Sequence, residues 1–328
     1  MTVQPAVRAT GLTKRYGDKN ALDGVDLQIP RGTVHGLLGP NGAGKTTAVR
    51  VLTTLTDADG GEASVAGYDV RRSPRDVRRH IGLAGQQPAV DDMMTARQNL
   101  TMFGRLFRPD KKSAQRRADE LLGTFGLEGV GRKSPKQFSA GMRRRLDLAA
   151  SMILAPEVLF LDEPTTGLDP AGRREVWEEV RTLSSQGTTV LLTNHYLDEA
   201  DQLCDWISVI DKGRNFVEDT PTGLKKRIGD ERLEVVVRDP GDSGQISQLS
   251  ELITRIADQQ PDVDPTAGRF SVPVPDGVAA LTALAVEIRN RDIDIADIAD
   301  IGLRRPTLDE AFLHLTAENT STSRKEPA

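Results

Sequence analysis

Three short stretches of the chain are dominated by apolar residues: 34–38, 158–161 and 188–193. Apolar runs without alternating polar positions are typical of strands inside a parallel sheet that is covered on both faces. Two further strand-like segments, 6–12 and 25–29, precede the first run. Because helical patterns separate these strands, the chain is predicted to contain an α/β core.

Helical periodicity dominates between the strands. Residues 47–55 are predicted to form a helix, and residues 95–126 carry two apolar stripes at helical spacing. The stripes consist of Leu100, Phe103, Leu106 and Phe107, and of Ala118, Leu121, Leu122 and Phe125. They fit either a buried core or a face that contacts a partner, and the spacing does not separate the two. A loop at 134–142 is expected to lead into a helix at 143–154.

A second region begins near residues 219–230, where turn residues and charges gather. Beyond it, a small α+β unit is predicted, with strands at 233–237, 270–274 and 293–303 and helices at 246–256, 278–288 and 307–316. The expected domains are 5–220 and 230–317, followed by a disordered tail at 318–328. The acids Asp292, Asp294, Asp297 and Asp300 lack the glycine and the terminal glutamate of a calcium loop, so they are interpreted as a charged edge strand.

Composition narrows the functional classes. The chain has 328 residues, 38% of them hydrophobic and 28% charged, which permits a sizeable core. A net charge of −5 argues against general nucleic-acid binding. The single cysteine, Cys204, excludes an internal disulfide and a cysteine-built zinc site and fits a reducing cytosol. Because no apolar run approaches the ~20 residues that span a bilayer, and residues 1–10 do not form a signal peptide, another chain is expected to supply any membrane span.

Candidate chemistry centres on one loop, Gly39-Pro40-Asn41-Gly42-Ala43-Gly44-Lys45-Thr46-Thr47, which matches G-x-x-x-x-G-K-[ST] in full. It follows a predicted strand and opens a predicted helix. The glycines allow successive backbone N–H groups to face phosphate oxygens, and the helix N-terminus adds positive potential. Lys45 is expected to bind the β- and γ-phosphates, and Thr46 to place its hydroxyl on Mg²⁺. The loop therefore predicts binding of a nucleoside triphosphate.

Acidic and imidazole groups follow two of the predicted interior strands. Asp162 and Glu163 end the run at 158–161, and His195 follows the run at 188–193. Carboxylates at the carboxyl end of a sheet strand lie where α/β folds bind ligands. Asp162 is expected to hold Mg²⁺, Glu163 to polarise an attacking water, and His195 to contact the γ-phosphate.

In their order along the chain, these motifs resemble the ATP-binding subunits of ABC transporters over about residues 5–220. The segment Phe138-Ser139-Ala140-Gly141-Met142 is similar to the family's Leu-Ser-Gly-Gly-Gln signature, and Ser139 stands 23 residues before Asp162, as in the family. Thr166-Gly167-Leu168-Asp169 resembles the D-loop. Gln86 resembles the glutamine of the Q-loop, with Gln87 as the neighbouring alternative. Tyr16 resembles the aromatic residue that stacks on adenine, and His195 the switch histidine.

The resemblance implies a P-loop NTPase with a parallel-sheet core, an antiparallel β subdomain and a helical signature subdomain. It also implies that two copies face head to tail. Each ATP then lies between Lys45, Thr46 and Gln86 of one copy and Ser139 and Gly141 of the other. The implied roles are catalysis by Glu163, His195 and Gln86, Mg²⁺ binding by Thr46, Gln86 and Asp162, and nucleotide contacts by Tyr16, residues 39–47 and Asp169. Because Phe138, Ala140 and Met142 depart from the consensus signature, they put turnover, rather than ATP binding, in question.

Two segments, 141–151 and 306–313, are similar to the daunorubicin/doxorubicin resistance ATP-binding proteins of bacterial exporters. This resemblance implies drug export through a separate multi-span membrane subunit, at the cytoplasmic face of the cell membrane, without a nucleic-acid partner. Relatives with the same layout export other drugs, lipids or polysaccharides, so the cargo stays open. The alternatives are an ABC ATPase that acts on DNA or ribosomes and a regulatory ATP sensor. The chain lacks the long coiled coils, the zinc module and the second cassette of the DNA and ribosomal types.

Overall fold

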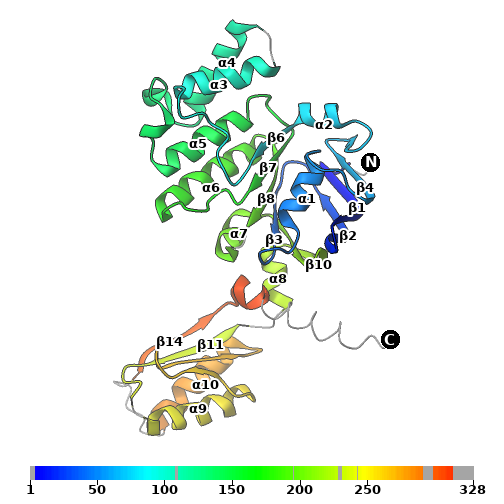
Figure 1. Cartoon of the computed structure of the whole chain (residues 1–328). Coiled ribbons are helices and arrows are strands. Elements are labelled where there is room, and N and C mark those ends of the chain that lie inside the picture. The colour runs from blue at the N-terminus through cyan, green and yellow to red at the C-terminus, as the bar shows by residue number, and fades with distance from the viewer. Residues whose placement is uncertain are drawn as a thin grey trace. The chain divides into compact units, whose positions relative to one another are not determined.

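The computed structural model describes residues 4–107, 110–194, 196–227, 231–241, 243–290 and 298–312. The chain divides into two compact units, residues 1–221 and 222–328 (Figure 1). Each unit has a sheet and a hydrophobic core of its own. Within the described residues, no helix has both the length and the apolar character needed to cross a membrane.

The core of the first unit is a six-stranded sheet. Its strand order is β10 (Arg214–Asp219), β9 (Trp206–Asp211), β3 (Val34–Leu38), β8 (Thr189–Asn194), β7 (Val158–Asp162) and β6 (Ile81–Ala84). Neighbours are parallel except β10 and β9. Every residue of β3, β7 and β8 is buried, which confirms the prediction of interior strands. The helices α6 (Pro170–Ser185) and α7 (Leu197–Leu203) pack against β3 and β8.

A second, antiparallel sheet joins this core through α1 (Lys45–Leu52). Its order is β2 (Lys19–Ile29), β1 (Val7–Tyr16), β4 (Gly60–Val65) and β5 (Tyr68–Asp69), followed by α2 (Pro74–His80). Val49 and Leu52 of α1 share one apolar cluster with residues of both sheets. The first two strands are longer than predicted, because Tyr16 pairs with Lys19 and the hairpin extends to its turn. Tyr16 is therefore the last residue of a strand, and not part of a connection.

The remaining part of the first unit is helical, with α3 (Ala96–Phe107), α4 (Lys111–Thr124), two short 3₁₀ turns η1 (Glu128–Val130) and η2 (Pro135–Gln137), and α5 (Ala140–Ser151). The predicted boundary at 142/143 is wrong. Helix α5 begins at Ala140 because the Ser139 hydroxyl caps it, accepting a hydrogen bond from the Met142 N–H at 3.2 Å. In α3, Leu100 is buried, whereas Leu106 is 70% exposed and Phe107 52% exposed. Within this stripe, Leu100 thus belongs to the buried core, whereas Leu106 and Phe107 are exposed, as a face that contacts a partner requires.

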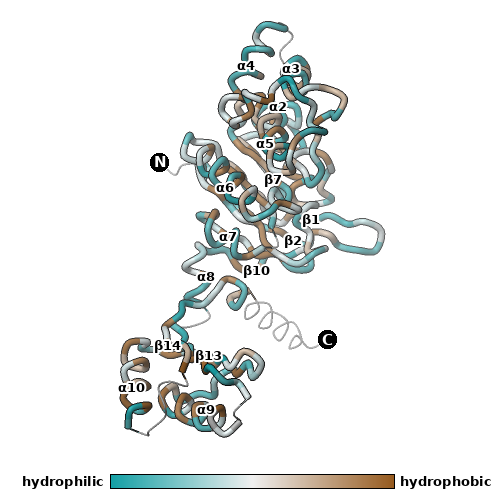
Figure 2. The backbone as a smooth tube through the Cα atoms, turned by 90° about the vertical axis from the view of Figure 1, so that its left-hand side faces the viewer, coloured by the Kyte–Doolittle hydropathy of each residue, from teal (hydrophilic) through white to brown (hydrophobic). Residues whose placement is uncertain are grey.

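The second unit contains the antiparallel sheet β12 (Asp262–Asp264), β13 (Arg269–Pro273), β11 (Arg232–Val237) and β14 (Ile298–Arg304). Helices α9 (Ser243–Ala257) and α10 (Gly277–Asn290) cover one face of it, and a short helix, α8 (Pro221–Arg227), spans the boundary of the units (Figure 1). Figure 2 shows that α10 is mostly hydrophobic, in contrast to the mostly hydrophilic α4 of the first unit. The strand β14 lies at an edge of the sheet, which confirms the edge assignment for Asp300. The other three acids, Asp292, Asp294 and Asp297, fall outside the described residues. The tail at 318–328 and the end of the predicted last helix also fall outside them.

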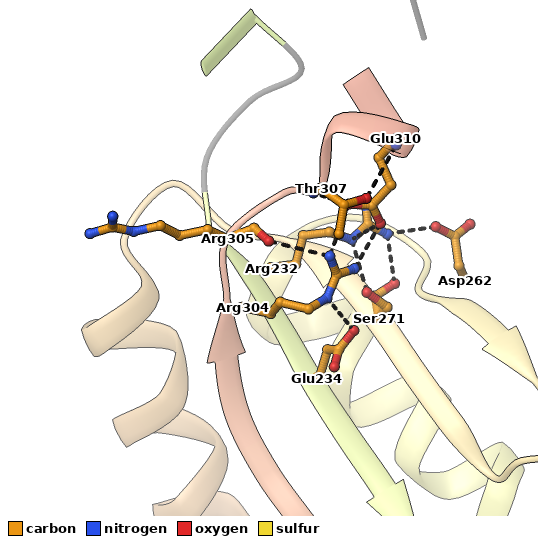
Figure 3. Close-up of polar contacts among 8 residues, drawn as sticks. All are labelled: Arg232, Glu234, Asp262, Ser271, Arg304, Arg305, Thr307 and Glu310. Carbon is orange, nitrogen blue, oxygen red and sulfur yellow. Dashed lines mark hydrogen bonds and ion pairs between the residues drawn. The ribbon is translucent and has the colours of Figure 1, made fainter. Parts of the chain in front are cut away.

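The opposite face of this sheet carries a network of charged side chains (Figure 3). The Arg304 guanidinium donates to both carboxylate oxygens of Glu310, at 2.7 and 2.9 Å, and to Glu234 at 2.6 Å. Glu310 also accepts from the Thr307 N–H at 2.9 Å, and the Thr307 hydroxyl accepts from the Glu310 N–H at 3.3 Å, which forms a capping box. These contacts lower the pKa of Glu310 to about 2, chiefly through the hydrogen bond from Arg304. The segment at 306–312 is thus joined to the sheet by a bidentate ion pair.

A buried histidine lies in β3, directly before the phosphate-binding loop. His35 Nε2 is 2.8 Å from the Ser208 hydroxyl, which donates to Glu218 at 2.8 Å. Because the hydroxyl hydrogen is used toward Glu218, His35 donates from Nε2, and burial keeps the ring neutral at pH 7. Burial lowers its pKa from 6.5 to about 4.

We predict that this histidine makes the stability of the first unit dependent on pH. Its pKa is lower in the folded than in the unfolded state, so the unfolded chain binds more protons between pH 6.5 and 4, and stability falls as the pH drops through this window. The loss is roughly 3 kcal/mol at pH 4 relative to pH 7. His35→Gln keeps a donor but cannot titrate. Urea unfolding should therefore show a smaller pH dependence for this variant, and equal slopes for both proteins would contradict the prediction.

Candidate nucleotide site

The phosphate-binding loop connects the buried strand β3 to α1. Gly44 immediately precedes the helix with φ 114°, a backbone conformation that favours glycine. A Cβ atom at this position would lie 2.4 Å from the Ala21 carbonyl oxygen of β2, and one at Gly39 would lie 2.1 Å from the Ile210 carbonyl oxygen of β9. The Ala43 carbonyl accepts from the Gly213 N–H at 2.8 Å, in the turn after β9. Contacts with two strands and one turn thus fix the loop's position.

One cavity of about 310 Å³ lies against this loop. Its lining residues come from β1 and β2, from the loop and α1, and from the segments that follow β6 and β7. They are Tyr16, Lys19, Ala21, Asn41, Gly42, Gly44, Lys45, Thr46, Thr47, Gln86 and Glu163. The structure therefore brings most of the residues predicted to bind nucleotide to one place. Gln86 lines the cavity, which favours it over its neighbour Gln87 as the site glutamine.

Lys45 is buried, and its ammonium group donates to carbonyl oxygens of its own loop. The bonds reach Gly39 at 2.6 Å and Pro40 at 3.1 Å. Burial lowers the pKa of Lys45, while the charges of Glu163 and Asp162 oppose this shift. The lysine is thus a cation held at the base of the loop, with two nearby carboxylates stabilising its charged form.

Asp162 ends β7 next to the threonines of two other elements. Its Oδ1 accepts from the Thr193 hydroxyl of β8 at 2.6 Å and from the Thr46 hydroxyl of α1 at 3.3 Å. A carboxylate and a hydroxyl this close supply the hard oxygen ligands that Mg²⁺ prefers. The chemistry of this pair therefore fits a magnesium ion bound together with phosphate oxygens.

Glu163 follows Asp162 with a left-handed backbone, φ 51°, which is strained for a residue with a side chain. Its N–H donates to the Thr193 carbonyl at 3.2 Å and to the Thr193 hydroxyl at 3.0 Å. Its carboxylate accepts from the Thr166 hydroxyl at 3.3 Å. The neighbouring strand thus holds the turn that points Glu163 into the cavity.

Ser139, Gly141 and Asp169 lie in a different place from the residues that line the cavity. Ser139 is exposed at the N-terminus of α5, and Asp169 caps α6 by accepting from the Gly172 N–H at 2.8 Å. The two helices approach closely, because a Cβ atom at Gly141 would be 3.7 Å from Gly172 Cα. The signature and the D-loop therefore form one surface.

Tyr16 and His195 are the two remaining predicted site residues. Tyr16 lines the cavity and is 47% exposed, and its ring centroid is 5.5 Å from the Lys14 ammonium. His195 falls outside the described residues, although Asn194 and Tyr196 on either side of it are described.

Sequence reasoning missed two features of this region. Lys19 brings a second ammonium group to the cavity, beside Gly42. The buried pair Arg144 and Asp147 of α5 anchors the segment around Gln86. Arg144 donates to the Gly85 carbonyl at 2.7 Å, and Asp147 accepts from the Ala89 N–H at 2.8 Å. Opposite charges three positions apart, and thus on one face of the helix, were the available signal for this pair.

Comparisons with known proteins agree with this geometry. The family model described as "ABC transporter" matches residues 22–166. The chain is 56% identical to the daunorubicin resistance ATP-binding protein DrrA2 of Streptomyces coeruleorubidus, covering 98% of this chain and 99% of that protein. It is 44% identical to the daunorubicin/doxorubicin resistance ATP-binding protein DrrA of Streptomyces peucetius, covering 98% and 97%.

Solved structures show the same fold over the first unit. An ATP-binding subunit of an ABC transporter superposes with a TM-score of 0.61 at 26% identity, covering 68% of this chain and 93% of that chain. A dimeric ATP-binding cassette in a post-hydrolysis state, bound to ADP and phosphate, has a TM-score of 0.59 at 24% identity, with 65% and 98% covered. The predicted ABC ATPase fold is therefore confirmed.

We predict that Gly44→Ala abolishes nucleotide binding. The new methyl group would collide with the Ala21 carbonyl and would require a backbone conformation that costs an L residue about 1–2 kcal/mol. Titration with a fluorescent ATP analogue measures the loss. Gly187→Ala is the matched control, because Gly187 has φ 99° but open space around it, so it carries only the backbone cost and should bind normally. Equal binding by both variants would show that the loop tolerates the collision.

Proposed function

The chain belongs to the ABC transporter ATP-binding proteins, within the daunorubicin/doxorubicin resistance subgroup, and from this premise we propose that it drives export of a hydrophobic drug through a separate membrane subunit. Its own activity is that of an ABC transporter ATPase. The observation that carries the proposal is the single cavity at which Lys45, Thr46, Gln86 and Glu163 meet. The drug class rests on relatives that match the chain over nearly its whole length, including the second unit.

In the proposed site, ATP replaces contacts that the loop now makes with itself. Lys45 exchanges the carbonyls of Gly39 and Pro40 for phosphate oxygens, while loop N–H groups and the α1 N-terminus face the same phosphates. Tyr16, at the open side of the cavity, stacks on the adenine. Thr46, Asp162 and Gln86 hold Mg²⁺, which neutralises charge on the phosphates.

Hydrolysis is assigned to Glu163. Its carboxylate accepts a proton from water as the water oxygen attacks the γ-phosphorus, and the bond between that phosphorus and the β–γ bridging oxygen breaks. The strained turn and its hydrogen bonds to Thr193 keep the carboxylate directed at the cavity. Gln86 orients the same water, and His195 stabilises the charge that develops on the γ-phosphate.

A second copy of the chain is proposed to complete each site. Ser139, Gly141 and Asp169 share a surface formed by α5 and α6, and they do not line the cavity of their own chain. In a head-to-tail pair, this surface closes over the partner's ATP. Because the signature binds the γ-phosphate, hydrolysis removes the contact and the pair opens, which is a ligand-driven shift between two states.

The membrane subunit is proposed to bind the helical part of the first unit. A groove of about 660 Å³ runs along α3 and α4, with Met94, Met102 and Leu106 among its lining residues. Leu106 and Met93 are the most exposed large apolar side chains of this region, at 70% and 82%. The segment around Gln86 is tied to α5 by Arg144 and Asp147, so movement at the γ-phosphate reaches these helices through buried contacts. The protein then works at the cytoplasmic face of the membrane, without a nucleic-acid partner.

We predict that Glu163→Gln binds ATP but loses turnover by at least about a hundredfold, since the amide cannot accept the proton. Gel filtration with ATP should show a stable dimer. Glu157→Gln is the control, because Glu157 precedes β7 at its other end and contacts Arg31 at the surface. Undiminished phosphate release by Glu163→Gln would remove this residue from the role of base.

Capture of the partner tests the transport proposal. Tagged Glu163→Gln protein, expressed in its native cell and held closed with ATP, should co-purify with a multi-span membrane protein after gentle solubilisation. Leu106→Glu in the same background should lose that protein while still forming the ATP-bound dimer, because the charge opposes burial of this exposed apolar position. Recovery of ribosomes or DNA-binding factors, with no membrane protein, would contradict export.

A further inference from the structure

A buried carboxylate outside the cavity joins segments that flank it. Glu199 of α7 is only 3% exposed. Its Oε2 accepts from the Thr165 hydroxyl at 2.5 Å and from the Asn194 side-chain amide at 2.6 Å. Thr165 lies two residues after Glu163, and Asn194 ends β8 immediately before His195. One carboxylate oxygen therefore connects the turn after β7 with the end of β8.

Arg173 of α6 extends these contacts. Its Nη1 is 3.6 Å from Glu199 Oε1, and its Nε donates to the Leu168 carbonyl at 3.2 Å. Its guanidinium also lies over the Tyr196 ring, 4.7 Å from the centroid. The same side chain thus contacts the D-loop and the residue that follows His195. We refer to Thr165, Arg173, Asn194, Tyr196 and Glu199 as the Glu199 cluster.

The position of the cluster indicates how it acts. In sequence, Asn194 and Tyr196 bracket His195, and Thr165 lies between Glu163 and the D-loop, but no member of the cluster lines the cavity. They therefore do not contact nucleotide in this arrangement. Hydrogen bonds of a buried carboxylate to two donors hold those donors at a fixed separation.

We propose that Glu199 is a positioning residue for hydrolysis, which holds Asn194 and Tyr196 together with Thr165 and the D-loop at 166–169 as one unit. The inference rests on the proposed function, because it assumes the roles given to Glu163, His195 and Asp169. The γ-phosphate contacts of one chain and its contact surface for the second copy then shift together. Without these contacts, the end of β8 and the D-loop move independently. ATP then still binds, but the geometry needed for hydrolysis is rarely populated.

The negative charge of Glu199 contributes to the cluster through its ion pair with Arg173. Glutamine has the same shape and keeps one oxygen for Thr165 and Asn194, but it directs an amide toward the Arg173 guanidinium, where both groups are donors. Thr165→Val is a milder change, because it removes one hydroxyl and conserves the branched shape. The two variants therefore disrupt different contacts of one carboxylate: Glu199→Gln the ion pair with Arg173, and Thr165→Val the hydrogen bond from Thr165.

A matched pair of threonines provides the test. Thr165 and Thr189 are each 1% exposed, but the Thr189 hydroxyl accepts from the Gly32 N–H at 2.9 Å at the amino end of β8, away from the site. We expect Thr165→Val to lower kcat for ATP about tenfold, with KM within twofold of the wild type. Thr189→Val should lower the melting temperature by a similar amount and leave kcat unchanged. Glu199→Gln should lower kcat at least as far, and the double variant should lose less than the product of the two single losses, because both changes weaken contacts of the same carboxylate.

The outcomes separate the inference from the function on which it rests. If Thr165→Val and Glu199→Gln keep wild-type kcat while Glu163→Gln is inactive, the Glu199 cluster is only structural and the proposed function stands. Equal loss of kcat in Thr165→Val and Thr189→Val would likewise assign the effect to stability. A wild-type protein that does not hydrolyse ATP would overturn both. If Glu199→Gln does not fold, the comparison of Thr165→Val with Thr189→Val still decides.

Discussion

The register of three parallel strands is the constraint on which the site depends. Leu38 of β3 pairs with Asn194 of β8, and Asp162 of β7 pairs with Thr193 of β8. All three strands are buried throughout, so a shift of one residue would turn buried side chains to the opposite face of the sheet and is strongly disfavoured. The phosphate loop, the two acids and Asn194 therefore lie at the same edge of the sheet. The chemistry of the first unit follows from this alignment more than from any single residue.

Buried polar contacts then connect this edge to the rest of the unit. Thr193 serves both Asp162 and Glu163, Arg144 and Asp147 anchor the segment around Gln86, and Glu199 ties the D-loop to the end of β8. Each contact joins parts that are distant in sequence, and each lies in a setting where an unpaired polar group would be costly. In the proposed function, these contacts are the route by which a change at the phosphates reaches helices far along the chain.

Much of this could be predicted because the signals are local. The phosphate loop is one continuous motif, and β3, β7 and β8 appear as apolar runs. The failures have physical causes. The strand β12 was missed because Asp-Val-Asp lacks the apolar alternation of a strand and all three residues are exposed. The start of α5 was misplaced because a serine cap draws Ala140 and Gly141 into the helix. The partners of Asp162, the contact of Asp147 with Ala89 and the contact of Glu199 with Thr165 could not be predicted, because pairing between distant parts of the chain leaves no periodic trace in a single sequence. The position of His195 stays a prediction.

The self-bonded state of Lys45 has a consequence for ligand selection. Because its ammonium donates to two carbonyl oxygens of the same loop, an anion that binds Lys45 competes with these internal acceptors. The binding free energy of an anion is then the difference between Lys45 bonded to the anion and Lys45 bonded to the two carbonyls. A small anion that offers a single oxygen therefore gains little by displacing both carbonyls. A triphosphate offers several oxygens along the full length of the loop. The Lys45 contacts within the loop thus favour a triphosphate over simple anions, independently of adenine or a second chain.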